Sequence, residues 1–496
     1  MRTNNMKIML ILPPLIVRKN EQSGVTPPLG IAYLAAVLEK QGYEVSLLDC
    51  IVEGYENSEI QDENIYIGLK WNEIEKRVRS FAPDVVGISC LFSLMFPEAL
   101  KVAEIVKGIE ADIKVVMGGA HPSSVPFQAL DDKNVDFIVI GEGEITFLEL
   151  IRSIEQETFV FAGIDGLGYK KGGIPQLNPR TKFIDNLDEI PFPARHLLPM
   201  EKYYSIGESH GGLKRNRYTS LISSRGCPGN CLYCSIHTVW GRHWRPRSPQ
   251  NVLDEIEHLV KQYGIKEIHF EDDNLTFDRE RARLIFQGII DRRLDITWTT
   301  PNGVAVWKLD KELLILMKQS GCYQINLGIE SGNEEVLRKI IRKPLKLEKV
   351  REIVKEIRNI GIWAHGFFIL GMPGETINTM METIDFALEL NLDSASFFVA
   401  TPYPGTKLYD ICKEHGYINN YDMRDLRVQS SMISTPEFTA AQLHELQALA
   451  YRRFMFHMLK REILPWNVVK RLMKLRTLDD AHFMYRKVSR LIKAVM

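Results

Sequence analysis

Continuous apolar runs alternate with amphipathic stretches along the first 150 residues of the chain. The apolar runs predict strands at Lys7–Leu12, Glu44–Asp49, Asp84–Ser89, Ile113–Gly119 and Val135–Glu144. The amphipathic stretches predict helices at Leu29–Gln41, Trp71–Phe81 and Pro97–Glu110. Strands that are apolar throughout are buried on both faces, so the alternation predicts a doubly wound (Rossmann-like) α/β domain with a parallel sheet. Such domains bind ligands at the carboxyl ends of their strands.

Small and polar residues gather where these strands are predicted to end. The segments are TPPLG (Thr26–Gly30), SCLFS (Ser89–Ser93), GGAHP (Gly118–Pro122) and GEGE (Gly141–Glu144). Glycine lets the backbone approach a large ligand closely. A single glycine is explained as well by a strand that simply ends. Four such segments on one sheet edge predict a ligand cleft.

A second series of strand and helix patterns begins near Arg217. Strands are predicted in TSLISSRGC and at Lys266–Asp273, Ile296–Gly303, Tyr323–Ser331, Ala364–Glu375 and Ser394–Gly405. Helices between them include Pro249–Tyr263 and Leu347–Ile360. Six units are too few for a closed eight-fold barrel, so we expect an open, partial (β/α)6 TIM barrel with its functional groups at the carboxyl ends of the strands.

These patterns divide the chain into four parts. We expect the doubly wound domain at 1–155, a Gly- and Pro-rich linker at 156–215, the partial barrel at 216–415 and a helical region at 416–496. From Arg452 to Met496 the chain carries twelve Lys and Arg against three acidic residues. Peripheral membrane contact through basic helices is one interpretation of this tail, and a solvated helical cap is the one we favour.

Composition narrows the class of protein. The formal net charge of -1 gives no electrostatic argument for a nucleic-acid partner. No apolar run reaches the roughly 18 residues that cross a bilayer. The run Ile8–Val17 is broken by prolines and lacks a cleavage site, so it is interpreted as a strand and not as a signal peptide. Four of the seven cysteines, Cys50, Cys90, Cys322 and Cys412, are scattered singly, which favours a reducing, cytoplasmic compartment.

The other three cysteines are concentrated in SRGCPGNCLYC (Ser224–Cys234), at Cys227, Cys231 and Cys234. Thiolates bind zinc or the iron of clusters. His237 would complete a Cys3His zinc site, but zinc ligands usually come as two separated pairs. A cubane iron–sulfur cluster is the other candidate. With three cysteine ligands such a cluster keeps one iron open to chelate a small molecule.

The C-x3-C-x-aromatic-C run, after a strand that opens a partial barrel, resembles the radical S-adenosylmethionine enzymes. The resemblance implies that the three cysteines hold a [4Fe–4S] cluster, whose fourth iron binds the methionine end of S-adenosylmethionine. One electron, from a donor such as flavodoxin or ferredoxin, then gives a 5′-deoxyadenosyl radical.

The same resemblance implies contacts to S-adenosylmethionine at the ends of the barrel strands. Tyr233 would lie beside the adenine, the triplet Glu271, Asp272 and Asp273 near the methionine amine, Glu330 and Ser331 at the carboxylate and ribose, and Gly371 and Pro373 of FILGMPGE along the adenine. The triplet departs from the commoner Gly-Gly-Glu, so which of its members contacts the amine stays open.

The first domain, which lies ahead of a radical barrel, resembles that of the cobalamin-binding radical S-adenosylmethionine proteins. The resemblance is carried by PPLGIAYLAAVLEKQGYEVSLLD and by VMGGAHPSSVP followed by VDFIVIGEGE. The implied cobalamin contacts are Thr26, Pro27, Gly30, Ser89, Gly118, Gly119, His121, Glu142, Gly143 and Glu144. The Asp-x-His-x-x-Gly motif of many other cobalamin proteins is absent, which leaves the lower face of the cobalt without an assigned ligand. His121, the only histidine in this domain, is interpreted first as structural.

This subclass implies methylation of an unactivated carbon or of phosphorus. Oxidative cyclisation or rearrangement, with or without cobalamin, is the alternative activity, and a corrinoid or iron–sulfur binding protein is the non-enzymatic alternative. The substrate, a small molecule or a lipid-like one, is not legible in the sequence. Trp240, Trp244, Trp298 and Tyr403 lie near predicted strand ends, where they line a pocket or, as aromatics in barrels do more often, form core.

Overall fold

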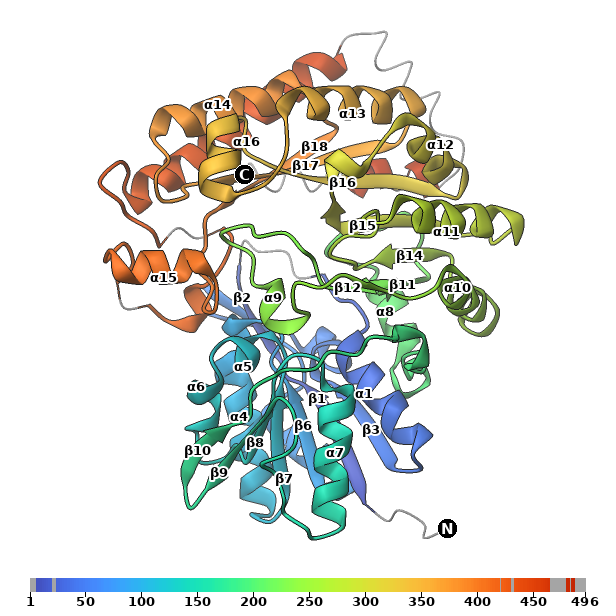
Figure 1. Cartoon of the computed structure of the whole chain (residues 1–496), viewed down its shortest axis with the longest axis vertical. Helices are drawn as coiled ribbons and strands as arrows, with labels where there is room; N and C mark the ends of the chain where they lie inside the picture. Colours follow the sequence, from blue (N-terminus) through green and yellow to red (C-terminus); the bar gives the residue numbers. More distant parts are fainter. Residues whose placement is uncertain are drawn as a thin grey trace.

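The computed structural model describes residues 6–19, 24–419, 421–429, 432–463, 479–481 and 483–486. Figure 1 shows two bodies, a lower one coloured blue to cyan and an upper one coloured green to orange. The short helix α9 (Ile236–Val239) lies where the two bodies meet. The chain therefore places the cysteine-rich segment, which leads into α9, at the boundary between its two main domains.

The lower body contains a seven-stranded sheet. Its parallel strands are β1 (Lys7–Leu12), β3 (Glu44–Asp49), β6 (Val85–Ser89), β7 (Lys114–Gly118) and β8 (Phe137–Val139), in the order β3-β1-β6-β7-β8. The antiparallel strands β9 (Leu167–Lys171) and β10 (Ile174–Leu177) extend it beyond β8. The order reverses between β1 and β6, and this switch point is where doubly wound sheets bind their ligands. The predicted fold class of this domain is confirmed.

Helices cover both faces of this sheet. Helix α1 (Leu29–Lys40) packs against α7 (Gly143–Glu155), and α3 (Trp71–Phe81) packs against α4 (Phe96–Ile109). Alternate residues of β1 enter different cores: Leu10 belongs to one apolar cluster and Ile11 to the other. Because both faces are buried, the strand is apolar throughout, as the sequence pattern predicts.

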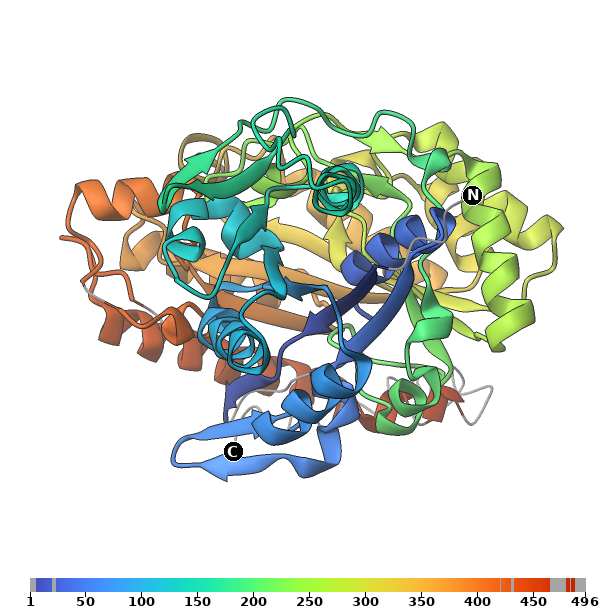
Figure 2. The same ribbon diagram turned by 90° about the horizontal axis from the view of Figure 1, so that it is seen from below.

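A small antiparallel sheet was not predicted. It pairs β2 (Leu15–Arg18) with β5 (Asn64–Ile67), and β5 with β4 (Glu59–Gln61). Figure 2 shows it at the lower edge of the molecule, to one side of the main sheet. Pro13 and Pro14 separate β2 from β1, so a single apolar run in the sequence contributes to two different sheets.

The upper body is built on six parallel strands in chain order: β11 (Tyr218–Leu221), β14 (Glu267–Phe270), β15 (Thr297–Val304), β16 (Cys322–Glu330), β17 (Trp363–Leu370) and β18 (Ser394–Val399). The helices that connect them are α10 (Pro249–Tyr263), α11 (Arg279–Asp291), α12 (Lys311–Gln319), α13 (Leu347–Ile360) and α14 (Ile377–Glu389). Because the described strands β18 and β11 do not pair with each other, the barrel is open, as expected.

The region after the barrel is helical where the structure describes it. Helix α15 (Lys407–Glu414) follows the last strand, and α16 (Ala440–Ile463) packs on α14 and β18. Residues 464–478 and 487–496, most of the basic tail, lie outside the described residues, so the interpretation of that tail stays a prediction. None of the described helices combines the length and apolar character that a bilayer crossing needs.

The segment around Phe483 returns to the barrel. Its ring contacts Tyr323 and Trp363 edge to face, with centroid separations of 5.2 and 5.5 Å. Tyr323 and Trp363 stand at the amino ends of β16 and β17. Asp480 pairs with Lys214 at 2.6 Å beside them. A segment from the far end of the chain thus covers the amino-terminal end of the barrel.

Candidate functional site

The three clustered cysteines lie in the loop between β12 (Ser224–Arg225) and α9. All three are free thiols. A Cβ atom built on Gly229 would lie 3.3 Å from Cys227 Sγ and 3.9 Å from Cys231 Sγ, so the loop curls around this glycine. Gly226, with φ +83°, has no room for a side chain, because a Cβ there would lie 2.3 Å from the carbonyl oxygen of His243. Gly226 is therefore required by the shape of the loop, and a side chain at Gly229 would crowd the Cys227 sulfur.

Three other segments hold this loop. The Leu232 amide donates to the carbonyl of Ile341 at 3.1 Å. Arg242 donates to the carbonyl of Gly229 at 2.8 Å. The ammonium of Lys407 donates to Asn230 Oδ1 at 3.3 Å. The loop is thereby attached to the β16–α13 connection, to its own continuation and to α15.

The donor set suits an iron–sulfur cluster. Burial raises the pKa of Cys231, and it raises the pKa of Cys234 to about 12, so without metal these thiols are neutral. Metal binding has to deprotonate them, and soft thiolates are the ligands that such clusters take. In the part of the chain described, no three His, Cys, Asp or Glu side chains converge as the ligands of one metal ion.

The predicted triplet at the end of β14 separates into three environments. Glu271 Oε2 lies 3.3 Å from His210 Nε2, and its Oε1 accepts from Ser220 Oγ at 3.2 Å. Asp272 is buried and accepts from the amide and hydroxyl of Ser223 at 3.0 and 2.7 Å. The carboxylates of Glu271 and Asp272 therefore already have hydrogen-bond or ion-pair partners within the protein.

Asp273 is the member of the triplet at the cysteine loop. Its carboxylate accepts a hydrogen bond from the amide of Gly226, the residue before Cys227. Its negative charge contributes to the raised pKa of Cys234. Burial raises the pKa of Asp273 to about 7, and the neighbouring Asp272 adds to this. A partly desolvated carboxylate beside the cluster loop, with no cation paired to it in the described residues, is the acceptor that an ammonium group would fit.

Glu330 anchors a second polar cluster beside the loop. It ends β16 with φ +71°, a left-handed conformation that strains a side chain of this size. Glu330 Oε1 accepts from Lys343 Nζ at 2.7 Å, and the hydroxyl of Tyr233 bonds to the same carboxylate. Lys343 also donates to the carbonyl of Gly328 at 2.7 Å. The predicted residues Tyr233 and Glu330 are therefore brought together.

Lys343 was missed by the sequence analysis. It follows a π-helix (Val336–Ile341), a feature that often marks functional sites. Its ammonium is buried, and its positive charge lowers the pKa of Cys231, against the larger rise that burial causes. In the sequence it is one of several cations in RKIIRKPLK, and nothing there distinguishes the buried one. Ser331 is turned the other way, with its hydroxyl 3.0 Å from Thr383 Oγ1.

The turn after β17 is closed by Glu375. Its Oε2 accepts from the amides of Gly371 and Met372 at 3.0 and 2.9 Å. Its Oε1 is buried without a hydrogen-bond partner in the described residues. Burial raises the pKa of Glu375 to about 8, so this carboxyl is mostly neutral at pH 7. Gly371, with φ +87°, leaves room for Leu443, whose Cδ2 would lie 2.2 Å from a Cβ there.

The inner face of the barrel is polar. Strand pairing places His269, Thr299 and Gln324 in one row across β14, β15 and β16. Glu267 accepts from His269 Nε2 at 2.9 Å and from the hydroxyl of Tyr323 at 2.8 Å. On β17, His365 lies 2.7 Å from Ser394 Oγ and 3.1 Å from Ser396 Oγ. These side chains were not predicted as site residues.

Trp298 confirms the interpretation as core, which is the more frequent one for aromatics in barrels. It is fully buried and stacks on Phe286 of α11, with ring centroids 4.8 Å apart. It points away from the row formed by its neighbour Thr299, into the layer between sheet and helices. Trp298 is therefore core and does not line a pocket. Trp240 lies over the guanidinium of Arg225, at 4.7 Å.

At the switch point of the first domain, Leu91 and Phe92 follow β6 with 48% and 56% of their surface exposed. Two adjacent exposed apolar side chains at this edge suit a large ligand with an apolar face. His121 is buried nearby, with Nδ1 3.0 Å from Ser93 Oγ and Nε2 without a partner in the described residues. Burial lowers the pKa of His121 to about 4, so the imidazole is neutral.

The acidic side chains of GEGE contact the other domain. Arg225 donates to Glu142 Oε1 at 3.0 Å and to Glu144 Oε1 at 2.6 Å, and Arg245 donates to Glu142 Oε1 at 2.9 Å. All four side chains are at most 5% exposed. Burial alone would raise the pKa of Glu144, but the charge and hydrogen bond of Arg225, together with a backbone hydrogen bond and the charge of Arg180, hold that pKa below its ordinary value. The GEGE segment is thus a buried ionic contact between the domains.

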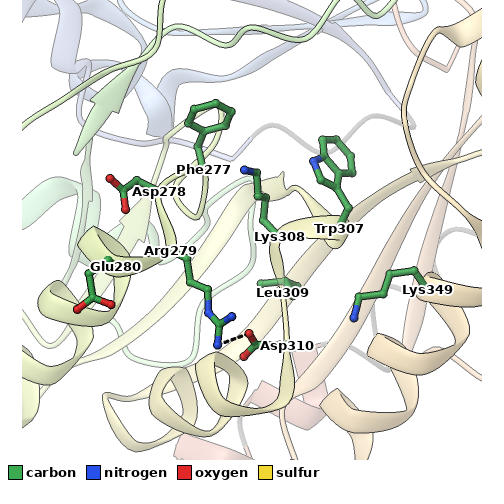
Figure 3. Close-up of a pocket in the computed structure, with 9 residues that line it drawn as sticks. All are labelled: Phe277, Asp278, Arg279, Glu280, Trp307, Lys308, Leu309, Asp310 and Lys349. Atoms are coloured by element: carbon green, nitrogen blue, oxygen red, sulfur yellow. Dashed lines mark ion pairs between the residues drawn. The ribbon is translucent and has the colours of Figure 1, made fainter.

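A cavity of about 630 Å³ lies away from these residues. Figure 3 shows its lining, which comes from the loops after β14 and β15 and from the starts of α11 and α13. Arg279 pairs with Asp310 across it, and Lys308 lies over the ring of Phe277 at 4.6 Å. None of the predicted site residues lines this cavity, and its mixture of acids and bases favours no particular ligand.

Comparison with known proteins agrees with this arrangement. The family profile described as "B12 binding domain" matches residues 17–151, and "Radical SAM superfamily" matches residues 221–387. Cytidylyl-2-hydroxyethylphosphonate methyltransferase of Streptomyces wedmorensis is 37% identical over 443 residues, 83% of each chain. The anaerobic magnesium-protoporphyrin IX monomethyl ester cyclase of Rubrivivax gelatinosus is 27% identical over 455 residues, 90% of this chain and 77% of that protein.

A solved structure shares the fold. The cobalamin-dependent S-adenosylmethionine radical enzyme OxsB, solved with aqua-cobalamin and S-adenosylmethionine, superposes with a TM-score of 0.71. The match covers 99% of this chain and 72% of that one at 17% identity. Both described bodies and their connection therefore have a counterpart of known fold.

Proposed function

Because the chain belongs to the radical S-adenosylmethionine superfamily, in the group with an N-terminal B12-binding domain, we propose that it is a methyltransferase acting on an unactivated carbon or on phosphorus of a small molecule. The observation that carries the proposal is the 37% identity to a methyltransferase over 83% of both chains. A match of that extent includes both domains and the connection between them.

When bound, the cluster and S-adenosylmethionine would supply a 5′-deoxyadenosyl radical, and cobalamin would supply the methyl group. Cys227, Cys231 and Cys234 hold the cluster in this proposal. Asp273 accepts the methionine ammonium beside the loop, and Lys343 pairs with the methionine carboxylate. Support comes from the burial of both charges next to the thiols.

The adenosine end occupies the carboxyl ends of β16 and β17. Tyr233 and Glu330, joined by a hydrogen bond, form one wall in the proposal, and Gly371 and Pro373 form the other. Glu375 shapes that second wall by fixing two of its amides. As a neutral carboxyl it does so without placing a negative charge near the bound groups.

Cobalamin occupies the switch point of the first domain in the proposal. The small residues Thr26, Gly30, Ser89, Gly118 and Gly119 allow the backbone to approach it. Leu91 and Phe92 cover one face of the corrin with apolar surface. Glu142 and Glu144 act through the domain contact, because their carboxylates are already paired with arginines.

The substrate binds in the polar interior of the barrel, between the two cofactors. His365, held by two serine hydroxyls, is the titratable group of β17 that faces this space in our proposal. A polar interior favours a small molecule with several hydrogen-bonding groups over a lipid.

Oxidative cyclisation is the second candidate, because the cyclase of Rubrivivax gelatinosus is similar over 90% of this chain. Methyl transfer and cyclisation can be distinguished with protein reconstituted without oxygen and S-adenosylmethionine that carries a deuterated methyl group. Methyl transfer yields 5′-deoxyadenosine, S-adenosylhomocysteine and a deuterated product in about equal amounts. Cyclisation yields 5′-deoxyadenosine without S-adenosylhomocysteine. Lack of a retained corrinoid would contradict the cobalamin-dependent proposal.

A further inference from the structure

Residues 209–212, in the segment that connects the two domains, lie along the polar inner face of the barrel. The hydroxyl of Ser209 lies 3.1 Å from His269 Nδ1, and the carbonyl of Gly212 accepts from the hydroxyl of Tyr323 at 3.4 Å. His269 belongs to β14 and Tyr323 to β16, so this short segment crosses several strands of the sheet. Part of the predicted linker thus forms a wall of the barrel interior.

His210 extends from this segment to the carboxyl end of β14. Its Nε2 lies 3.3 Å from Glu271 Oε2, and Glu271 is held in turn by Ser220 Oγ at 3.2 Å. Because an ionised carboxylate only accepts hydrogen bonds, the proton of this contact belongs to Nε2. Nδ1 has no hydrogen-bond partner among the residues that the structure describes. One side of the ring is therefore anchored, and the other is available to a ligand.

The imidazole of His210 faces a space that is enclosed and still accessible. The side chain of His210 is 44% exposed and that of Glu271 is 15% exposed. Burial nevertheless acts to lower the pKa of His210, an effect that a side chain on the open surface would lack. The charge and hydrogen bond of Glu271 outweigh burial and raise that pKa above its ordinary value. The ring therefore stays protonated on both nitrogens to a higher pH than a free histidine.

The histidines on the barrel strands have no such free nitrogen. His269 uses its two ring nitrogens for Ser209 and Glu267. Both ring nitrogens of His365 lie within hydrogen-bond distance of serine hydroxyls on β18. Within the described ranges, His210 is therefore the imidazole of the barrel interior that keeps an unused donor.

His210 also lies between the segments that are proposed to contact the two cofactors. A Cβ atom built on Gly24 would lie 2.2 Å from the amide nitrogen of His210, and the chain continues from Gly24 into TPPLG, the proposed cobalamin segment. On the other side, Glu271 stands two residues before Asp273, which is proposed to accept the methionine ammonium. A substrate that receives a methyl group has to bind between these segments.

We propose that His210 is a substrate-binding residue, which donates a hydrogen bond from Nδ1 to an oxyanion of the substrate. The substrate is then a small molecule that carries a phosphoryl or a carboxylate group. Hydrogen bonds between charged partners are shorter and stronger than neutral ones, so this contact orients the substrate as well as binding it. The inference rests on the proposed function, because that function places the substrate in the barrel interior.

The test measures the binding of two simple anions to the reconstituted holoenzyme with S-adenosylmethionine bound. Inorganic phosphate is followed by the broadening of its phosphorus NMR signal, and acetate by the broadening of its labelled carboxylate carbon signal. For at least one of them, the Kd should rise at least about tenfold in His210→Ala, as expected for the loss of a hydrogen bond between charged groups. The anion that shows this dependence distinguishes a phosphoryl from a carboxylate group.

Two further variants separate a binding role from a structural one. His210→Lys keeps a positive charge at this position and should restore part of the affinity, which a purely structural role would not predict. His196→Ala is the matched control, because His196 Nε2 also pairs with a glutamate, Glu39, at 3.0 Å, but at an exposed position. Iron and corrinoid contents equal to those of the unmodified enzyme show that each variant is folded.

The proposal is overturned if the Kd values of both anions are the same in His210→Ala as in the unmodified enzyme, or if His196→Ala loses as much affinity. Lost binding that His210→Lys does not restore at all also overturns it, because the positive charge is then not what the anion recognises. Failure of the proposed function looks different. Anion binding would still depend on His210, whereas the reaction with deuterated S-adenosylmethionine would give no S-adenosylhomocysteine.

Discussion

Arg225 Nη2 lies 2.6 Å from Glu144 Oε1, and the two side chains, 3% and 5% exposed, belong to different domains. Arg225 stands two residues before the first clustered cysteine, and Glu144 stands in the first turn of α7. The rings of Tyr33 and Trp240 lie 5.2 and 4.7 Å from the guanidinium. This contact fixes the cysteine loop relative to the carboxyl edge of the first sheet.

Breaking the Arg225–Glu144 pair should uncouple radical formation from methyl transfer. Glu144→Gln leaves the buried guanidinium partly unpaired, which costs about 3 to 5 kcal/mol for a buried pair. We expect a lower unfolding midpoint and more 5′-deoxyadenosine per methylated product, because the cluster loop is no longer held at its place. Glu149→Gln, at an exposed position on the same helix, should change neither quantity. An unchanged product ratio in a folded Glu144→Gln enzyme would show that the contact does not couple the domains.

Glu375 makes stability depend on pH in a defined direction. Its folded pKa of about 8 lies above the ordinary 4.5, so the folded state binds more protons between these values and stability falls as pH rises. The loss between pH 4.5 and 7 is about 3 kcal/mol. Glu375→Gln should lack this part of the slope. The check is the difference in denaturant midpoint between the two proteins at several pH values, and a constant difference would contradict it.

Lys343 is expected to bind the methionine carboxylate. Lys343→Met removes that cation and leaves Glu330 unpaired, so the Kd for S-adenosylmethionine should rise at least about tenfold, a loss of about 1.4 kcal/mol. Lys343→Arg should restore part of the affinity. Equilibrium dialysis on reconstituted protein measures the Kd, with Lys339→Met, an exposed neighbour, as control. Wild-type affinity in Lys343→Met would remove Lys343 from the site.

Cys231 is expected to be a cluster ligand. Cys231→Ala should abolish reductive cleavage of S-adenosylmethionine and lower the iron content from about four per chain. Cys412→Ala, at a buried cysteine on α15 outside the loop, should retain both. Iron analysis and quantification of 5′-deoxyadenosine test this directly. Retained cleavage in Cys231→Ala would overturn the cluster assignment.

Leu91 and Phe92 are expected to contact the corrin. Leu91→Asp/Phe92→Asp places charge on that apolar surface, so corrinoid retained after desalting should fall about tenfold or more, while iron content stays the same. Phe127→Asp is the control, because Phe127 is similarly exposed, at 52%, and lies on α6 (Pro126–Leu130). The visible spectrum reports the corrinoid, and equal retention in both variants would exclude this contact.

Local chemistry made much of this protein predictable. Apolar strands such as β1 are recognisable because both of their faces are buried, and the three cysteines are recognisable because they share one short loop. The role of GEGE was not predictable in the same way. Glu144 and Arg225 form their ion pair only in the folded chain, and no local sequence pattern relates the two residues. Lys343 shows the same limit, because the buried cation of RKIIRKPLK is distinguished only by its pairing with Glu330 in the folded chain.

Phe483 comes after every strand of the barrel in the sequence, yet its ring covers Tyr323 and Trp363 at the amino-terminal end of that barrel. During synthesis, the strands and the cysteine loop therefore emerge from the ribosome before the residue that closes this end. A chain that stops short of Phe483 would contain all the residues proposed as ligands and would lack the ring that covers Tyr323 and Trp363. Completion of the amino-terminal end of the barrel is therefore a late event in synthesis, separate from formation of the cysteine loop.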